Sequence, residues 1–128
     1  MVHQWNQAFG INEPEFIDIT DEEVNALVVS LLDEEVNELR EALLEKNHVK
    51  VLDALTDIQY VLDGAYLRLG YSPQLKDLAF AEVQRSNMSK LGEDGQPIRR
   101  EDGKILKGPN YTPPDLEKVI SDYIKTID

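Results

Sequence analysis

Residues 32–43 read LDEEVNELREAL and residues 51–66 read VLDALTDIQYVLDGAY, and these two stretches decide the fold. In the first, apolar side chains recur at steps of three and four residues, which is the spacing of one face of an α-helix. The pattern predicts a helix from residue 21 to about 46 and a second from about 49 to 69. Because so short a connection separates them, the two helices are expected to pack antiparallel. The apolar stripe of the first helix comprises Val28, Leu32, Val36, Leu39 and Leu43.

The rest of the chain predicts shorter elements around this helix pair. Residues 1–20 look irregular, and Thr20 is the expected N-cap of the first long helix. A third helix is expected from Pro73 to about Met88. An Asp-Gly pair within residues 97–107 predicts a small β-hairpin, and a last helix follows Asp115. The 128 residues are therefore expected to form a single all-α domain, 1–128, a bundle of about four or five helices with a hairpin appendage.

Acidic side chains are concentrated in the first half of the chain. Residues 1–63 hold 15 acidic and 3 basic side chains, whereas residues 64–128 hold 10 of each, so the net charge is −12. This balance argues against nucleic-acid binding, which needs a basic surface. The sequence lacks a long apolar run, a secretory signal and any cysteine, which excludes a membrane span and disulfides. A cytoplasmic protein is expected.

Four carboxylates lie where the two long helices should face each other. Glu35 and Glu38 flank the apolar stripe of the first helix, one turn apart. Asp53 and Asp57 form a narrow polar stripe on a mostly apolar second helix, where repulsion and desolvation cost stability. A divalent cation would offset that cost, and oxygen ligands without cysteine suit Mg²⁺ or Mn²⁺. The alternative is an ordinary solvated charge pattern on a helix surface.

The two motifs together resemble those of the all-α nucleoside triphosphate pyrophosphohydrolases, the superfamily of MazG, the dimeric dUTPases and phosphoribosyl-ATP pyrophosphohydrolase. Its signature is EExxE, present here at residues 34–38, followed by ExxD on the next helix. Ala54 stands where the ExxD glutamate is expected, and the extra acid is Asp53, as in a MazG-like branch with a DxxxDxxYVxxG motif. The resemblance covers nearly the whole chain and implies a MazG-like bundle. Further similarity lies in segments 5–10 (WNQAFG), 85–90 (RSNMSK) and 113–116 (PPDL).

The resemblance implies hydrolysis of a nucleoside triphosphate between the α and β phosphates, giving a monophosphate and pyrophosphate. Glu35, Glu38 and Asp57 are then the principal ligands of two or three Mg²⁺ or Mn²⁺ ions. Glu34 is a further ligand or positions the attacking water, and Asp53 is an additional ligand. Family members work as homodimers or dimers of dimers with sites near subunit interfaces. No covalent nucleophile is required, because metal-neutralised pyrophosphate is a good leaving group.

Basic residues of the second half are candidates for binding the phosphates. Arg85, Asn87 and Lys90 form a set of donors suited to phosphate or sugar oxygens. Lys104 and Lys107, on the predicted hairpin, are expected to close over the phosphates as a lid. The alternative is an exposed hairpin whose charges pair with one another.

Aromatic residues near the N-terminus suggest a pocket for the base. Trp5 and Phe9 offer stacking surfaces, Asn6 offers an amide to read a base edge, and Tyr60 lies on the stripe of Asp57. Simple packing against the bundle is the alternative. Similarity to a phage-type, MazZ-like branch places dGTP first among substrates and dUTP second. The competing function is a non-catalytic acidic interaction module or nucleic-acid mimic.

Overall fold

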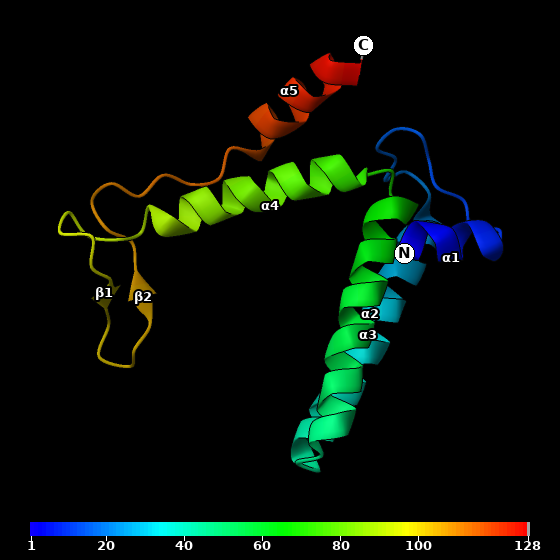
Figure 1. The fold of residues 1–128 in the computed structure, drawn as a ribbon, viewed down its shortest axis with the longest axis horizontal. Coiled ribbons are helices and arrows are strands. Elements are labelled where there is room, and N and C mark those ends of the chain that lie inside the picture. The colour runs from blue at the N-terminus through cyan, green and yellow to red at the C-terminus, as the bar shows by residue number, and fades with distance from the viewer. Residues whose placement is uncertain (128) are drawn as a thin grey trace. The chain divides into compact units, whose positions relative to one another are not determined.

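The computed structural model describes residues 1–127, and helices dominate it. The all-α class is confirmed, with one two-stranded sheet as the predicted appendage. The fold divides into two units, Met1–Pro73 and Gln74 to the end of the chain, which are described separately. The elements, coloured in chain order in Figure 1, are α1 (Val2–Ala8), α2 (Glu22–Leu44), α3 (His48–Arg68), α4 (Pro73–Met88), β1 (Ile98–Arg99), β2 (Ile105–Leu106) and α5 (Leu116–Ile127). No helix within residues 1–127 is both long and apolar enough to cross a membrane.

An aspartate, and not the predicted Thr20, caps the first long helix. The Asp21 carboxylate accepts hydrogen bonds from the backbone N–H groups of Glu23 (3.0 Å) and Val24 (3.2 Å). The Thr20 hydroxyl instead donates to Asp18 at 2.6 Å. The prediction of Thr20 was therefore wrong by one residue, because the neighbouring Asp18 holds the hydroxyl that would otherwise cap the helix.

A tight turn joins α2 to α3, and the two helices pack antiparallel as predicted (Figure 1). Lys46 adopts a left-handed conformation with φ of 55°, which reverses the chain. The Asn47 side chain then caps α3 by accepting hydrogen bonds from the N–H groups of Val49 and Lys50, both at 3.1 Å. Gly70 follows α3 with φ of +83°, as expected of a residue that ends a helix.

The first twenty residues are not irregular throughout, because residues 2–8 form α1, which contacts α3. Asn6 is only 2% exposed, and its side-chain amide donates to Glu13 at 3.0 Å. The backbone carbonyl of Asn6 accepts a further bond from the N–H of Ile11 at 2.9 Å. A helix this short has no measurable periodicity, and its tertiary contacts hold it in place.

Few apolar side chains of the first unit are buried. Val28, Ala42, Ala54 and Ala65 make up its buried hydrophobic core. In the predicted stripe of α2, Val36 is 41% exposed and Leu43 is 55% exposed. On α3, which was expected to be buried on most sides, Leu52 is 66% exposed and Leu55 is 50% exposed. The helices α2 and α3 pack on each other and α1 packs on α3, but these apolar side chains lie outside those contacts and stay exposed in a single chain.

The second unit begins with α4 and ends with α5. Its hairpin pairs Ile98 with Leu106 and Arg99 with Ile105 in antiparallel register, and Gly103 makes the predicted turn with φ of +87°. The residues that follow return to α4. There the buried Ser86 hydroxyl donates to the carbonyl of Thr112 at 2.8 Å, and the Ser89 hydroxyl accepts from the Thr112 N–H at 3.0 Å.

Candidate active site

Three of the predicted carboxylates meet at the interface of α2 and α3. Glu35 and Glu38 come from α2 and Asp57 from α3, and one oxygen of each lies within 4.8 Å of the others. Glu35 and Asp57 are half-buried, whereas Glu38 is exposed. The helical spacing places Glu35 and Glu38 one turn apart, and the antiparallel packing brings Asp57 opposite them. The predicted juxtaposition of these three acids is thus present in the fold.

Glu35 is the strained member of this cluster. Its Oε2 atom is buried and has no hydrogen-bond partner within residues 1–127. Burial, followed by the approach of Glu38 and the negative charges of Asp57 and Glu34, raises the pKa of Glu35 to about 7. A buried carboxylate oxygen without a donor, beside two further carboxylates, is the arrangement that a divalent cation satisfies. The residues present therefore fit the expected metal.

Two acids that were predicted as ligands lie outside the cluster. Glu34 is exposed and lines a shallow hollow on α2 together with Asp33 and Asn37. Asp53 is exposed one turn before Asp57 on α3. Neither offers an oxygen to the group formed by the three clustered acids. Their roles as ligands stay predictions.

A cavity of about 320 Å³ adjoins the carboxylates in the first unit. Three residues predicted for the base pocket line it: Trp5, Asn6 and Tyr60. The Trp5 and Tyr60 rings meet edge to face with centroids 6.5 Å apart. Phe9, the fourth predicted residue, is not part of the lining and instead stacks on Trp5 at 4.6 Å. The complete lining is Val2, Trp5, Asn6, Leu31, Glu35, Asp57, Tyr60, Val61, Gly64 and Arg68.

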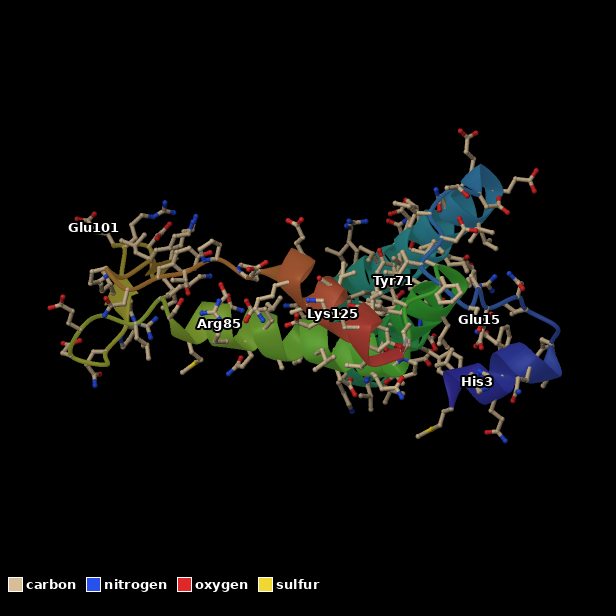
Figure 2. All side chains as sticks on the ribbon, turned by 90° about the horizontal axis from the view of Figure 1, so that it is seen from above. His3, Glu15, Tyr71, Arg85, Glu101 and Lys125 are labelled. Atoms are coloured by element: carbon tan, nitrogen blue, oxygen red, sulfur yellow. The ribbon has the colours of Figure 1, made fainter. Side chains whose placement is uncertain are left out.

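A small polar network behind the cavity fixes the amide of Asn6. One carboxylate oxygen of Glu13 accepts from Asn6 Nδ2 at 3.0 Å, and the other pairs with His3 Nδ1 at 2.6 Å. His3 lies on α1 and is labelled in Figure 2. The bond to Glu13 uses one of the two N–H groups of the Asn6 amide, which leaves the amide oxygen and the second N–H for a ligand.

Sequence reasoning missed Arg68 as a member of this site. Asp57, Tyr60, Gly64 and Arg68 follow one another along α3 at steps of three and four, and all four line the cavity. That helical spacing is the signal in the sequence that could have identified Arg68. The spacing alone does not reveal the cavity, because the cavity exists only where Trp5 and Asn6 of α1 cover α3.

The predicted phosphate-binding residues all belong to the second unit. Arg85, on α4 (Figure 2), binds Glu82 at 2.7 and 3.0 Å and the Thr112 hydroxyl at 2.6 Å. The Lys107 ammonium lies 4.8 Å from the centre of the Tyr111 ring. Asn87 and Lys104 are exposed, and Lys90 is half-buried. Arg85 and Lys107 thus have partners within their own unit, and the binding of phosphate by these five residues stays a prediction.

Comparison with known proteins adds two results. A profile of the phosphoribosyl-ATP pyrophosphohydrolase family matches residues 3–87, which include the whole carboxylate cluster and every residue of the cavity lining except Val2. Twenty-four chains of solved structures match, among them a provisionally assigned NTP pyrophosphohydrolase from Exiguobacterium sp. 255-15. That structure is 27% identical, has a TM-score of 0.51, and the match covers 99% of this chain and 95% of that chain. A search of curated proteins gives no significant match. The matched profile spans most of the chain, and the protein therefore belongs to the phosphoribosyl-ATP pyrophosphohydrolase family.

Proposed function

We propose that this protein is a metal-dependent pyrophosphohydrolase that cleaves a nucleoside triphosphate into its monophosphate and pyrophosphate. The observation that carries the proposal is a three-carboxylate cluster, Glu35, Glu38 and Asp57, that borders a cavity lined by aromatic rings. A cavity of this volume, with an apolar wall and a few polar groups at one end, is typical of a small-molecule site. Family membership and the structural neighbour support the same reaction class.

The cluster would hold Mg²⁺ or Mn²⁺, in the expected number of two or three ions. Bound cations reverse the local field, activate water and stabilise the charge of the leaving pyrophosphate. Without them, three carboxylates would repel a triphosphate. Glu35 and Asp57 also line the cavity, so cations bound to them would hold the phosphates at that end while the Trp5 ring meets the base. Because the pKa of Glu35 is raised to about 7, its carboxyl group holds a proton up to near neutral pH, and a bound cation would take the place of that proton.

The substrate is proposed to be dGTP first and dUTP second, with the base held against the Trp5 and Tyr60 rings. Arg85, Asn87, Lys90, Lys104 and Lys107 remain the proposed contacts to phosphate, and Glu34 and Asp53 remain proposed additional ligands. The proposed location is the cytoplasm.

The test is an assay of pyrophosphate release with Mg²⁺ or Mn²⁺, using the Asp57→Asn variant and Glu41→Gln as a control. Glu41 is an exposed acid on α2 outside the cluster, so its removal changes the net charge equally. Asp57→Asn should lower kcat by at least about 10³-fold with its helical spectrum intact, and Glu41→Gln should retain activity. An acidic nucleic-acid mimic would show no turnover and would retain its partner binding in the Asp57→Asn variant.

We propose further that the protein is a homodimer or a dimer of dimers. The supporting observation is the row of large apolar side chains that a single chain leaves open on α2 and α3, such as Leu43, Leu52 and Leu55. Patches of this kind mark interfaces. Sedimentation equilibrium should give at least twice the monomer mass, and Leu52→Asn should shift the protein toward monomers. A monomeric wild type would refute this proposal.

A further inference from the structure

Arg68 is a cation whose side chain has no hydrogen-bond or ion-pair partner among the residues that the structure describes. It lies in the last turn of α3, is half-buried, and lines the cavity that also contains Glu35 and Asp57. Within residues 1–127, its guanidinium makes no hydrogen bond, ion pair or ring contact. Asn6, a buried polar residue that also lines the cavity, has its amide nitrogen bound to Glu13.

A purely structural role does not account for this placement. A cation in the last turn of a helix interacts favourably with the helix dipole, but that effect works equally well for an exposed side chain. Within residues 1–127 the Arg68 guanidinium lines the cavity with no protein acceptor, so its N–H groups are available to a ligand. A ligand that brings carbonyl or ring-nitrogen acceptors into the cavity would bind these donors with charge-assisted hydrogen bonds.

The distance along α3 indicates which part of a nucleotide Arg68 would meet. Arg68 follows Asp57 by eleven residues on the same helix face, which corresponds to about 16 Å between their backbones. Helical side chains lean toward the N-terminus, so the guanidinium lies closer to Asp57 than this value. Tyr60 and Gly64 line the cavity between the two. With the phosphates at the carboxylates, Arg68 is at the end where the base of an extended nucleotide would lie.

We propose that Arg68 selects a base with a carbonyl group on its edge, guanine above all. This inference rests on the proposed function, because it assumes that the phosphates occupy the carboxylate end. A guanidinium donates two parallel hydrogen bonds to O6 and N7 of guanine. Uracil offers one such carbonyl, whereas adenine and cytosine present an amino group whose N–H bonds would face those of Arg68. The free amide oxygen of Asn6 offers a complementary acceptor for the N–H groups of guanine.

The experiment compares dGTP, dATP and 7-deaza-dGTP as substrates of the wild type, Arg68→Ala and Lys50→Ala. Lys50 is an exposed cation on the same helix and pairs with Glu45 on the surface. The wild type should prefer dGTP over dATP, and Arg68→Ala should reduce that ratio of kcat/KM by about 10- to 100-fold. Removing the N7 acceptor in 7-deaza-dGTP should weaken the wild type and leave Arg68→Ala unchanged. Lys50→Ala should retain the wild-type ratio.

Two results would overturn the inference. If Arg68→Ala loses kcat/KM equally for dGTP and dATP, Arg68 contacts the phosphates and not the base. If kcat/KM stays at the wild-type value for both substrates, Arg68 has no role in selection. Binding of dGMP and dAMP by the wild type, measured by calorimetry without metal, separates this inference from the proposed function. If no triphosphate is hydrolysed but dGMP binds better than dAMP and Arg68→Ala abolishes the difference, the base selection stands and the hydrolysis fails. If Arg68→Ala does not fold, the 7-deaza comparison in the wild type and in Arg68→Lys decides the question.

Discussion

Replacing Glu35 by glutamine should stabilise the protein at neutral pH in the absence of divalent cations. Burial and the neighbouring acids raise the pKa of Glu35 from 4.5 to about 7, so the folded state holds a proton that the unfolded chain releases. Folding stability should therefore fall as the pH rises from 4.5 to about 7. At about 1.4 kcal/mol for each pKa unit, the shift corresponds to an upper limit of about 3–4 kcal/mol. The adjoining cavity admits water, and screening should leave about 1–2 kcal/mol.

Chemical denaturation at pH 5 and pH 8, with a chelator and at fixed protein concentration, measures this effect. Glu35→Gln should match the wild type at pH 5 and exceed it by about 1–2 kcal/mol at pH 8. Glu41→Gln, which removes an exposed acid from the same helix, should show no such gap. Adding Mg²⁺ at pH 8 should stabilise the wild type and close the difference. A Glu35→Gln variant no more stable than the wild type at pH 8 would refute the reasoning.

Substitutions at three other positions test the fold. Gly70→Ala should lower the free energy of unfolding by at least about 2 kcal/mol, because φ is +83° and a Cβ would lie 2.1 Å from the carbonyl oxygen of Phe16; an unchanged melting temperature would contradict this packing. Hydrogen bonds from Arg85 lower the pKa of Glu82 from 4.5 to about 2. The ionised Glu82 therefore stabilises the fold above pH 4.5, and this stabilisation is lost as the pH falls toward 2. Glu82→Gln should therefore melt lower than the wild type at pH 7 and show a flatter decline toward pH 2, which circular dichroism would measure. In urea unfolding, Asn47→Ala should lower the free energy of unfolding by about 1 kcal/mol because the α3 N-cap is lost. Asn47→Asp should retain most of the wild-type stability, because aspartate also caps helices.

The long helices and their carboxylates were accessible from the sequence because both depend on helical spacing. A stripe repeated over several turns predicts α2 and α3 to within one or two residues at each end. Once two such helices pack antiparallel, Glu35, Glu38 and Asp57 must come close, and the structure has them within 4.8 Å. Glu34 lies next to Glu35 in the sequence, but a step of one residue turns a helical side chain by about 100° and leaves Glu34 outside the cluster. Asp53 lies one turn before Asp57, which displaces it by about 6 Å along the helix axis from the position that meets Glu35 and Glu38.

The remaining features depend on contacts between distant residues. The helix α1 is too short to show a period and is held by the bond from Asn6 to Glu13. Arg68 gains a place in the site only because α1 covers that part of α3. Apolar periodicity likewise predicts a buried stripe but not what covers it, and in one chain Leu43 and Leu52 stay exposed.

The most direct test of the central claim is the product analysis of a single reaction. Purified protein is incubated with Mg²⁺ and each common ribo- and deoxyribonucleoside triphosphate, and the phosphorus products are identified by ³¹P NMR for the wild type and Asp57→Asn. We expect the wild type to convert at least one of them, dGTP foremost, into its monophosphate and pyrophosphate, and Asp57→Asn to convert none. Release of a diphosphate and orthophosphate, or no turnover of any triphosphate, would contradict this expectation.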